Sequence, residues 1–396
     1  MSKLVSLNLP VGTSQPTHAD VVIVGGGVMG TSIAFHLAEA GVRNIVLIER
    51  AELGRGSSAK PLGGVRATFS DPANIILGQR SLRSFENFND RFKTDIGLRK
   101  VGYLFLCRSE AELLACEQST HIQNRLGSNS RMVSPTQAVE INPFLRQEAL
   151  VGASFSPEDG FAEPEKVVHA YAQAARSLGV HILEHTEVMD VSTAGGSISA
   201  VTTNRGTIQT SAVICCAGAW SQRVGEMVEV NLPVTPVRRQ IGMTPQLSTP
   251  MPTVPFTLDL STTMYFHNYA NGMLLGISNS DQKPGFNRDF THEWLSEFNA
   301  AARICAPALA EPELAQGWAG LYENTPDHNA LIGVSKTVQG FYYATGFSGH
   351  GFLQGPAVGE LIRDLFLGRE SFIDHSSFSA DRFTEAAKLF QEVHII

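Results

Sequence analysis

Three glycines near the start of the chain have the spacing of a dinucleotide-binding turn. Gly25, Gly27 and Gly30 follow the apolar run "DVVIVG" in a G-x-G-x-x-G pattern. Glycines there permit a tight turn, close approach of the backbone to a pyrophosphate, and close packing of the next helix, whose N-terminus favours negative charge. Glu49 lies 49 − 30 = 19 residues further on, where an acidic side chain bonds a ribose hydroxyl. An acid at this point disfavours a 2′-phosphate, so the stretch predicts NAD or FAD and not NADP.

The segment that follows Glu49 favours FAD over NAD. A polar, glycine-rich run, "LGRGSSAKPLGGVRATFS", comes almost directly after the acid. A nicotinamide dehydrogenase would be expected to proceed to another helix there, whereas this run can wrap a long, buried cofactor. The sequence therefore predicts FAD.

A second glycine turn, "SGHG", precedes an apolar helix face near the C-terminus. We expect the helix to begin just after Gly351, with Pro356 in its first turn, because proline is tolerated there. The helix N-terminus would then favour the negative charge that a reduced flavin acquires near N1 and C2=O. His350 is placed to add to this stabilisation; the alternative is a structural histidine of the turn.

Strands and helices alternate around these two turns. "DVVIVG", the helix face of Met29, Ile33 and Leu37, and "NIVLIE" predict a βαβ unit. "EPEKVVHAYAQAARSLGVHILEHTEVMDV" and "GTIQTSAVICCAGAW" are expected to return to the same sheet. Six of the 19 prolines lie between Pro233 and Pro255, just before the predicted hairpin "MYFHNYANGMLLGI". Prolines at that density suit edge strands and crossings between domains.

These patterns predict an α/β (α+β) fold of two domains, as the 396-residue length also suggests. One is a Rossmann-like FAD-binding domain with a mixed sheet, and the other a largely antiparallel substrate domain. The two are expected to alternate along the chain. The predicted FAD-binding segments are 19–94, 150–232 and 319–396, and the substrate-domain segments are 95–149 and 233–318.

The composition of the chain limits which partners and which cellular location are expected. Acidic residues outnumber basic ones 38 to 30, and this net charge opposes broad attraction to nucleic acid or anionic lipid. No apolar run approaches the roughly 20 residues that span a bilayer. The first 18 residues predict a loose arm and do not resemble a secretory signal. Cys215 and Cys216 are adjacent, and the five cysteines favour buried thiols over disulfides or a metal site. We expect a cytoplasmic protein without a bound metal.

Six stretches occur in the order typical of one flavoprotein superfamily: "VVIVGGGVMGTSIAFHLAEAG", "GSSAKPLGGVR", "TEVMDV", "VICCAGAW", "GLYENTPDHNALIG" and "ATGFSGHGF". Over nearly its whole length the chain resembles the D-amino acid oxidase-like FAD-dependent oxidoreductases. More narrowly, it resembles their sarcosine oxidase (beta subunit) and dimethylglycine dehydrogenase branch. This resemblance implies FAD as the cofactor and an amine as the substrate.

The resemblance also implies which residues contact FAD. For the aliphatic residues among them, packing beside the site is the alternative. The implied contacts are Gly25, Gly27, Val28, Met29 and Gly30 at the pyrophosphate, Glu49 and Arg50 at the adenosine ribose, Ser57 and Ser58 at the phosphates or ribitol, Leu62, Gly63 and Gly64 beside the isoalloxazine, Val188 at the adenine, Gly218 and Trp220 under the cofactor, and Gly349, His350, Gly351, Phe352 and Leu353 at the flavin N1 region.

Three residues are predicted to act on the substrate: Arg66, Tyr265 and His350. Arg66 aligns with the family's carboxylate-binding arginine, and its planar fork suits a carboxylate; a salt bridge between domains is the alternative. Tyr265 is expected over the flavin face, with core packing as its alternative. The neighbouring His267 is expected at the surface.

The chain departs from the monomeric sarcosine oxidases at three positions. Gly320 stands where they carry the cysteine that bonds the flavin, so the resemblance implies a non-covalent FAD. Leu274 replaces their oxygen-activating lysine, which argues against fast oxidation by oxygen. Leu353 replaces their second carboxylate-binding lysine, which favours an amine larger or more apolar than a simple glycine derivative.

The predicted activity is oxidation of the C–N bond of a secondary or tertiary amine, an N-substituted or cyclic amino acid. Hydride transfer to flavin N5 would give an imine or iminium, with oxygen or an electron-transfer partner as the acceptor. One alternative is an FAD-dependent 2-hydroxy acid dehydrogenase, for which His350 is the obvious base. Another is a flavin-bearing subunit of a multi-subunit electron-transfer complex, so both homo-oligomers and heteromeric complexes stay open.

Overall fold

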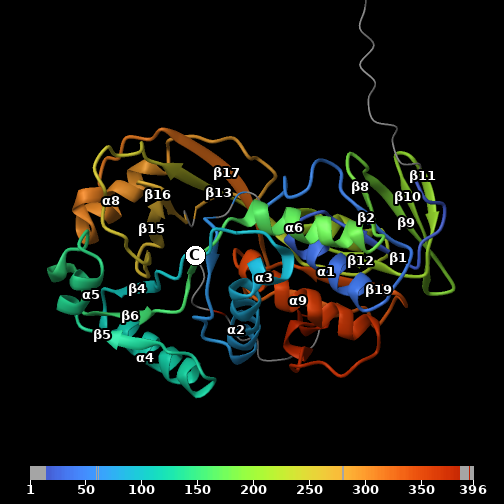
Figure 1. Cartoon of the computed structure of the whole chain (residues 1–396), viewed down its shortest axis with the longest axis horizontal. Helices are drawn as coiled ribbons and strands as arrows, with labels where there is room; N and C mark the ends of the chain where they lie inside the picture. Colours follow the sequence, from blue (N-terminus) through green and yellow to red (C-terminus); the bar gives the residue numbers. More distant parts are fainter. Residues whose placement is uncertain (1–14, 59, 61, 279–280, 384–391, 393–396) are drawn as a thin grey trace, which may run out of the picture.

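The computed structural model describes residues 15–58, 60, 62–278, 281–383 and 392. Residues 1–14 of the predicted N-terminal arm lie outside these ranges. Within the described residues, two main sheets lie side by side, and α1, α6 and α9 accompany the one on the right of Figure 1. No helix in this part of the chain is long and apolar enough to span a bilayer.

The first sheet has the order β18-β19-β12-β1-β2-β8. Its strands run parallel except β18, which is antiparallel to β19. Every residue of β1 and β2 is buried, as expected of parallel strands covered on both faces. This confirms the predicted mixed sheet. The strands are β1 (Val21–Val24), β2 (Ile45–Ile48), β8 (His181–Leu183), β12 (Val213–Cys215), β18 (Leu331–Val334) and β19 (Phe341–Thr345).

Three helices pack together beside this sheet: α1 (Val28–Glu39), α6 (Pro164–Ser177) and α9 (Gly351–Phe366). The predicted α1 face of Met29, Ile33 and Leu37 is buried. Helix α9 begins at Gly351, one residue before the predicted start, and ends before Gly368, whose φ is +63°.

The expectation for Pro356 is wrong. It is the sixth residue of α9, inside the helix and beyond its first turn. A proline there removes one backbone donor and disturbs the helical hydrogen bonds. Neighbouring helices supply partners for the adjoining backbone. Ser32 of α1 donates to the Gly355 carbonyl at 2.9 Å, and the Ala357 N–H donates to Ser81 of α2 (Pro72–Glu86) at 3.1 Å. Contacts with neighbouring helices therefore accommodate a proline inside α9, a position that local sequence preferences disfavour.

The second sheet has the order β17-β13-β16-β15-β14-β4-β6-β5. All neighbours are antiparallel except β14 and β4, which confirms the largely antiparallel second layer and the hairpin of β15 and β16. Its strands are β4 (Tyr103–Cys107), β5 (Arg131–Val133), β6 (Gly152–Ser156), β13 (Thr235–Met243), β14 (Phe256–Asp259), β15 (Met264–Tyr269), β16 (Gly272–Ile277) and β17 (Gln316–Asn324).

The two sheets draw on alternating segments of the chain. The first takes strands from the segments 19–94, 150–232 and 319–396. The second takes β4 and β5 from 95–149 and most of the rest from 233–318, but β6 lies just beyond residue 150 and β17 runs past residue 319. A division by sheets would move both boundaries by a few residues. The two-domain division itself stays a proposal.

The remaining elements connect or flank the sheets. A small sheet, β11-β10-β9, lies at the right of Figure 1. The other elements are α2 (Pro72–Glu86), α3 (Phe88–Phe92), α4 (Glu110–Arg125), α5 (Pro135–Ile141), α7 (Ser221–Glu226), α8 (Leu295–Cys305), β3 (Gly64–Val65), β7 (Gly160–Phe161), β9 (Val188–Ala194), β10 (Ser197–Thr203) and β11 (Gly206–Gln209).

Candidate functional site

One cavity of about 1120 Å³ takes lining residues from both sheets. Its volume exceeds the roughly 300–1,000 Å³ of ordinary small-molecule pockets, as a dinucleotide together with a substrate would require. Gly30 and Gly63 are the predicted site residues that do not line it. Those that do are Gly25, Gly27, Val28, Met29, Glu49, Arg50, Ser57, Ser58, Leu62, Gly64, Arg66, Val188, Gly218, Trp220, Tyr265, Gly349, His350, Gly351, Phe352 and Leu353.

The glycine turn forms a cradle at the N-terminus of α1. Gly25 has a φ of +114°, which glycine adopts readily. A Cβ at Gly27 would lie 2.8 Å from the Ser58 hydroxyl, whereas one at Gly30 would lie 1.9 Å from the Gly25 carbonyl oxygen. Gly27 therefore keeps the cavity open, and Gly30 permits the helix to pack against the turn.

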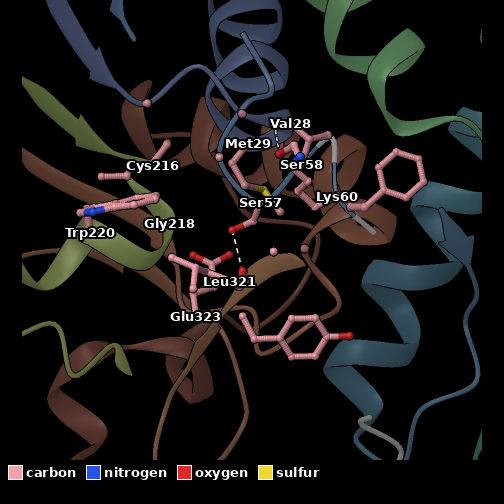
Figure 2. Close-up of a pocket in the computed structure, with 18 of the residues that line it drawn as sticks. Val28, Met29, Ser57, Ser58, Lys60, Cys216, Gly218, Trp220, Leu321 and Glu323 are labelled. Carbon is pink, nitrogen blue, oxygen red and sulfur yellow. Dashed lines mark hydrogen bonds between the residues drawn. The ribbon is translucent and has the colours of Figure 1, made fainter. Parts of the chain in front are cut away.

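The first turn of α1 suits a pyrophosphate. It carries no acidic residue, and Gly27 supplies no side-chain cap, so backbone N–H groups and the positive end of the helix dipole face the cavity. The Val28 N–H donates to the Ser58 hydroxyl at 2.9 Å (Figure 2). Ser58 thus holds a position in which it could exchange this bond for one to a phosphate.

Glu49 supports the turn from the end of β2. Its carboxylate accepts hydrogen bonds from the Gly26 N–H at 2.8 Å and the Ala51 N–H at 2.9 Å. A carboxylate oxygen can accept more than one hydrogen bond, so these bonds leave room for a ribose hydroxyl. The side chain predicted to bind the ribose also fixes the backbone of the turn.

Cationic and aromatic side chains gather at this end of the cavity. The Arg50 guanidinium lies 3.8 Å from the centre of the Trp220 ring. Trp220 stacks on Phe286 with ring centres 5.5 Å apart, and the Arg223 guanidinium lies 4.7 Å from the Phe286 ring. Burial lowers the pKa of Arg50. Aromatic side chains suit the planar adenine of a dinucleotide, and the arginines suit its pyrophosphate.

A partly buried carboxyl, Glu323, points toward the middle of the cavity from β17 (Figure 2). It accepts a hydrogen bond from the Thr345 hydroxyl at 3.1 Å. Burial raises its pKa to about 7, although bonds from the backbone of Gly346 and Phe347 and from Thr345 favour ionisation. Ser57 donates to the Leu321 carbonyl at 2.7 Å, which ties the predicted FAD-wrapping segment to the same strand.

Arg66 lies deep in the cavity wall and is 6% exposed. Its guanidinium lies 4.1 Å from the Phe69 ring centre and donates to the Thr68 carbonyl. Burial lowers its pKa, and Tyr103, Glu392 and Asp159 oppose that shift. Asp159 also accepts bonds from Ala67 and Thr68. These bonds hold the loop that presents Arg66.

His350 precedes α9 and is fully enclosed. Its ring lies edge-on to Phe69 with centres 5.4 Å apart, and neither ring nitrogen has a hydrogen-bond partner among the described residues. Burial, with a smaller effect of Arg66, lowers the pKa of His350 to about 3. The imidazole is therefore neutral near pH 7 and can offer one N–H but no positive charge.

Tyr103, Tyr265 and Phe256 line the cavity, and His267 packs against Phe256 with ring centres 4.9 Å apart. Tyr265 lines the cavity from β15, and Tyr103 stacks on Phe256 with ring centres 4.4 Å apart. The surface position expected for His267 is wrong: it is 1% exposed. One ring nitrogen lies 2.7 Å from the Asn268 carbonyl oxygen and the other 3.1 Å from that of Leu62, so His267 braces the Leu62 segment.

Of the three residues that differ from the sarcosine oxidases, Gly320 and Leu353 line the cavity and Leu274 does not. Gly320 lines the cavity, and a Cβ there would lie 2.8 Å from the Lys60 Cβ. Leu353 lines the cavity at the start of α9. Leu274 is buried in β16, outside the set of described residues that line the cavity.

Several residues of the cavity were not predicted from the sequence: Tyr103, Arg239, Tyr322 and Glu323. Tyr322 and Glu323 lie within "GLYENTPDHN", the motif already singled out, so its polar side chains were an available signal. Arg239 shares the strand β13 with Arg238, and the sequence does not indicate which of the two faces the cavity.

The lining residues fit FAD along the length of the cavity. The α1 cradle and the Arg50–Trp220 cluster suit the adenosine diphosphate part. The N-terminus of α9, which has no side-chain cap, suits the electron-rich side of a flavin. No group of His, Cys, Asp and Glu among the described residues could hold a metal ion, and all five cysteines are buried.

Comparisons with known proteins agree with this fit. The glycine oxidase of Geobacillus kaustophilus (strain HTA426) is 30% identical over 373 residues, which cover 92% of this chain and 97% of that protein. The mitochondrial dimethylglycine dehydrogenase of Mus musculus is 25% identical over 385 residues, 92% of this chain but 44% of that longer protein.

A solved structure is similar over almost the whole chain. The crystal structure of L-proline dehydrogenase from P. horikoshii superposes with a TM-score of 0.88 at 30% sequence identity, covering 93% of this chain and 99% of that one. The model of the DAO family, described as FAD dependent oxidoreductase, matches residues 20–365. The chain therefore belongs to the DAO family and is an FAD-dependent oxidoreductase.

Proposed function

We propose that this protein oxidises the C–N bond of a secondary or tertiary amine, specifically an N-substituted or cyclic amino acid. The observation that carries the proposal is the meeting of Arg66 and the N-terminus of α9 in the cavity that also contains the α1 cradle. Relatives named for glycine, dimethylglycine and proline oxidation support the substrate class. The sarcosine oxidase and dimethylglycine dehydrogenase branch is the narrower assignment that we propose.

The chain's own residues would bind and orient the amine. Arg66 would receive the carboxylate through its planar fork, while Tyr103, Tyr265 and Phe256 exclude water around the carbon next to nitrogen. Bound FAD would supply the two-electron chemistry by accepting the hydride at N5. The α9 N-terminus would stabilise negative charge on the reduced cofactor. An amine with its lone pair free needs no strong base, so orientation and electrostatics carry this step.

The state of His350 favours an amine over a 2-hydroxy acid. Oxidation of an alcohol requires a base for the O–H proton, and His350 was the residue available for that role. A pKa near 3 makes its imidazole a poor base at neutral pH. We therefore rank the hydroxy acid dehydrogenase below the amine oxidoreductase.

Anaerobic spectroscopy of the purified protein tests the proposal. Addition of N-methyl and cyclic amino acids is expected to bleach the flavin absorption, and addition of 2-hydroxy acids to leave it unchanged. Bleaching by hydroxy acids alone would overturn the assignment. Flavin that is bleached by amines but not reoxidised in air would favour an electron-transfer partner over oxygen as the acceptor, as the replacement of the family lysine by Leu274 suggests.

The Arg66→Ala variant tests the substrate-binding role. Loss of charge-assisted hydrogen bonds worth about 1.5–3 kcal/mol should lower kcat/KM for carboxylated amines roughly 10- to 100-fold. Flavin content should not change, since the adenosine and pyrophosphate contacts are elsewhere. Equal kinetics in variant and wild type would remove Arg66 from the substrate site. A cytoplasmic location and a homo-oligomeric or heteromeric state stay proposals, for which fractionation and light scattering are the measurements.

A further inference from the structure

A second arginine, Arg239 of β13, lines the same cavity as Arg66. One terminal nitrogen of Arg239 donates to the Arg238 carbonyl at 3.2 Å. The guanidinium carbon lies 5.3 Å from the centre of the Tyr322 ring. The Nε atom is buried and has no hydrogen-bond partner within the described part of the chain. A buried donor without a partner is costly, so this group is suited to a partner that enters the cavity.

No carboxylate of the described residues balances the charge of Arg239. Burial lowers its pKa, and the two groups that oppose the shift are the phenols of Tyr322 and Tyr265. No carboxylate among the described residues contributes. Glu323 faces the same cavity, but its pKa responds to burial and to its own hydrogen bonds, not to Arg239. A buried cation of this kind calls for an anion.

Arg66 differs in this respect. The carboxylates of Glu392 and Asp159 both favour its charged form. Glu392 is 2% exposed and accepts hydrogen bonds from the N–H groups of Ser70 and Asp71 at the start of α2. Carboxylates of the protein thus balance part of the charge of Arg66. The charge of Arg239 lacks such a balance among the described residues.

Tyr322 links the two arginines. Burial raises the pKa of Tyr322, and Arg239 and Arg66 oppose that shift. The Arg239 guanidinium lies 5.3 Å from the centre of its ring. Its ring packs against Gly349, where a Cβ would collide with it. The neighbouring His350 ring lies 5.4 Å from the Phe69 ring, whose centre is 4.1 Å from the Arg66 guanidinium. Through these contacts both cations border the end of the cavity where α9 begins.

We propose that the amine substrate carries two acidic groups, one bound by Arg66 and the second by Arg239. This inference rests on the proposed function. The substrate class is an amine flanked by, or substituted with, two carboxylates, such as an N-carboxyalkyl amino acid or an N-alkylated acidic amino acid. Arg239 is a specificity-determining residue in this arrangement. It selects the dianion, while Arg66 binds the carboxylate common to both mono- and dianionic amines.

Two thioethers test the inference by binding to the FAD-loaded protein, without turnover. Thiodiglycolate has two carboxylates, and (methylthio)acetate has one; sulfur replaces the amine nitrogen in both. We expect thiodiglycolate to perturb the flavin spectrum with a Kd at least tenfold lower than that of (methylthio)acetate. Equal affinities in the wild-type protein would overturn the inference, and this comparison needs no variant to fold.

Variants assign the preference to Arg239. In Arg239→Gln the ratio of the two Kd values should fall to within about twofold, with the Kd of (methylthio)acetate nearly unchanged. Arg239→Lys should retain part of the ratio. Arg238→Gln is the matched control: it removes the same charge from the same strand, but Arg238 bonds Gln282 at 3.2 Å and the Asp289 carbonyl at 2.9 Å, outside the set of lining residues.

The outcomes separate this inference from the proposed function. Equal loss of affinity for both thioethers in Arg239→Gln would mean a general or structural role and would overturn it. If N-methylaspartate and N-methylalanine bleach the flavin equally well, the amine activity stands and the dianion preference fails. If thiodiglycolate binds tightly but no amine bleaches the flavin, the anion site stands and the proposed function fails.

Discussion

Two roles of the glycine turn, room for the cofactor at Gly27 and close helix packing at Gly30, can be separated by substituting each glycine with alanine in turn. Gly30 lies within α1, and Gly27 has a φ of −79°, so alanine suits the backbone conformation at both positions and only space distinguishes them. At Gly30 the new Cβ would lie 1.9 Å from the Gly25 carbonyl oxygen. Ordinary contact begins near 3.4 Å, so the helix must shift by about 3.4 − 1.9 = 1.5 Å.

Such overpacking costs about 1–3 kcal/mol, offset in part by the higher helix propensity of alanine, about 1 kcal/mol. Gly30→Ala should therefore lower the unfolding free energy of the FAD-free protein by up to about 2 kcal/mol. At Gly27 the new Cβ would meet only the flexible Ser58 side chain, at 2.8 Å from its hydroxyl. Gly27→Ala should change that stability by less than about 0.5 kcal/mol, yet weaken FAD at least tenfold, because the methyl group fills the cradle.

Urea unfolding of the FAD-free proteins followed by circular dichroism measures the first effect, and titration with FAD followed by flavin fluorescence measures the second. Each variant serves as the control for the other. Equal destabilisation by both substitutions, or unchanged FAD affinity in Gly27→Ala, would refute the division between packing and cofactor binding.

Three further predictions follow from the site and its surroundings. Burial raises the Glu323 pKa from 4.5 to about 7, so the folded FAD-free protein keeps this proton to higher pH than the unfolded chain and loses stability as the pH rises from 4.5 through 7. Glu323→Gln should remove up to about 3 kcal/mol of this loss. The measurement is the difference between the urea midpoints at pH 4.5 and pH 8, which should be smaller in the variant. With Gly320 in place of a cysteine, acid denaturation should release all the flavin into the supernatant, and yellow colour retained by the precipitate would contradict this. Arg382 and Asp327 form a buried pair at 2.8 Å, so Arg382→Met should cost about 3–5 kcal/mol in thermal unfolding, whereas a near-neutral result would mean that Asp327 is satisfied by its other neighbours.

Local patterns in the sequence were sufficient to predict the first sheet, beside which the α1 cradle lies. The spacing of Gly25, Gly27 and Gly30 and the apolar runs on either side predict the βαβ unit because each depends on neighbours along the chain. The start of α9 at Gly351 was predicted to within one residue for the same reason. Pro356 and His267 were misjudged because their surroundings come from distant segments: Ser32 and Ser81 beside the proline, and Leu62 beside the histidine.

The substrate end of the cavity was harder to predict. Arg239 and Ile241 of β13 line it, whereas Arg238 does not. Successive residues of a strand face opposite sides, and a shift of one residue exchanges the two faces. The sequence "PVRRQIG" contains both arginines, and only the pairing of β13 with β17 decides which one enters the cavity.

The order of the chain determines when this cavity can exist. β18, β19 and α9 are contributed by residues 331–366 of a 396-residue chain. Helix α9 contains a proline and draws on side chains of α1 and α2 for its backbone bonds. A chain still being synthesised has the α1 cradle early but lacks the wall opposite it. Acquisition of FAD in its final position must therefore follow the synthesis of residues 331–366, and before then the apolar faces that pack against α9 lack this helix as a partner.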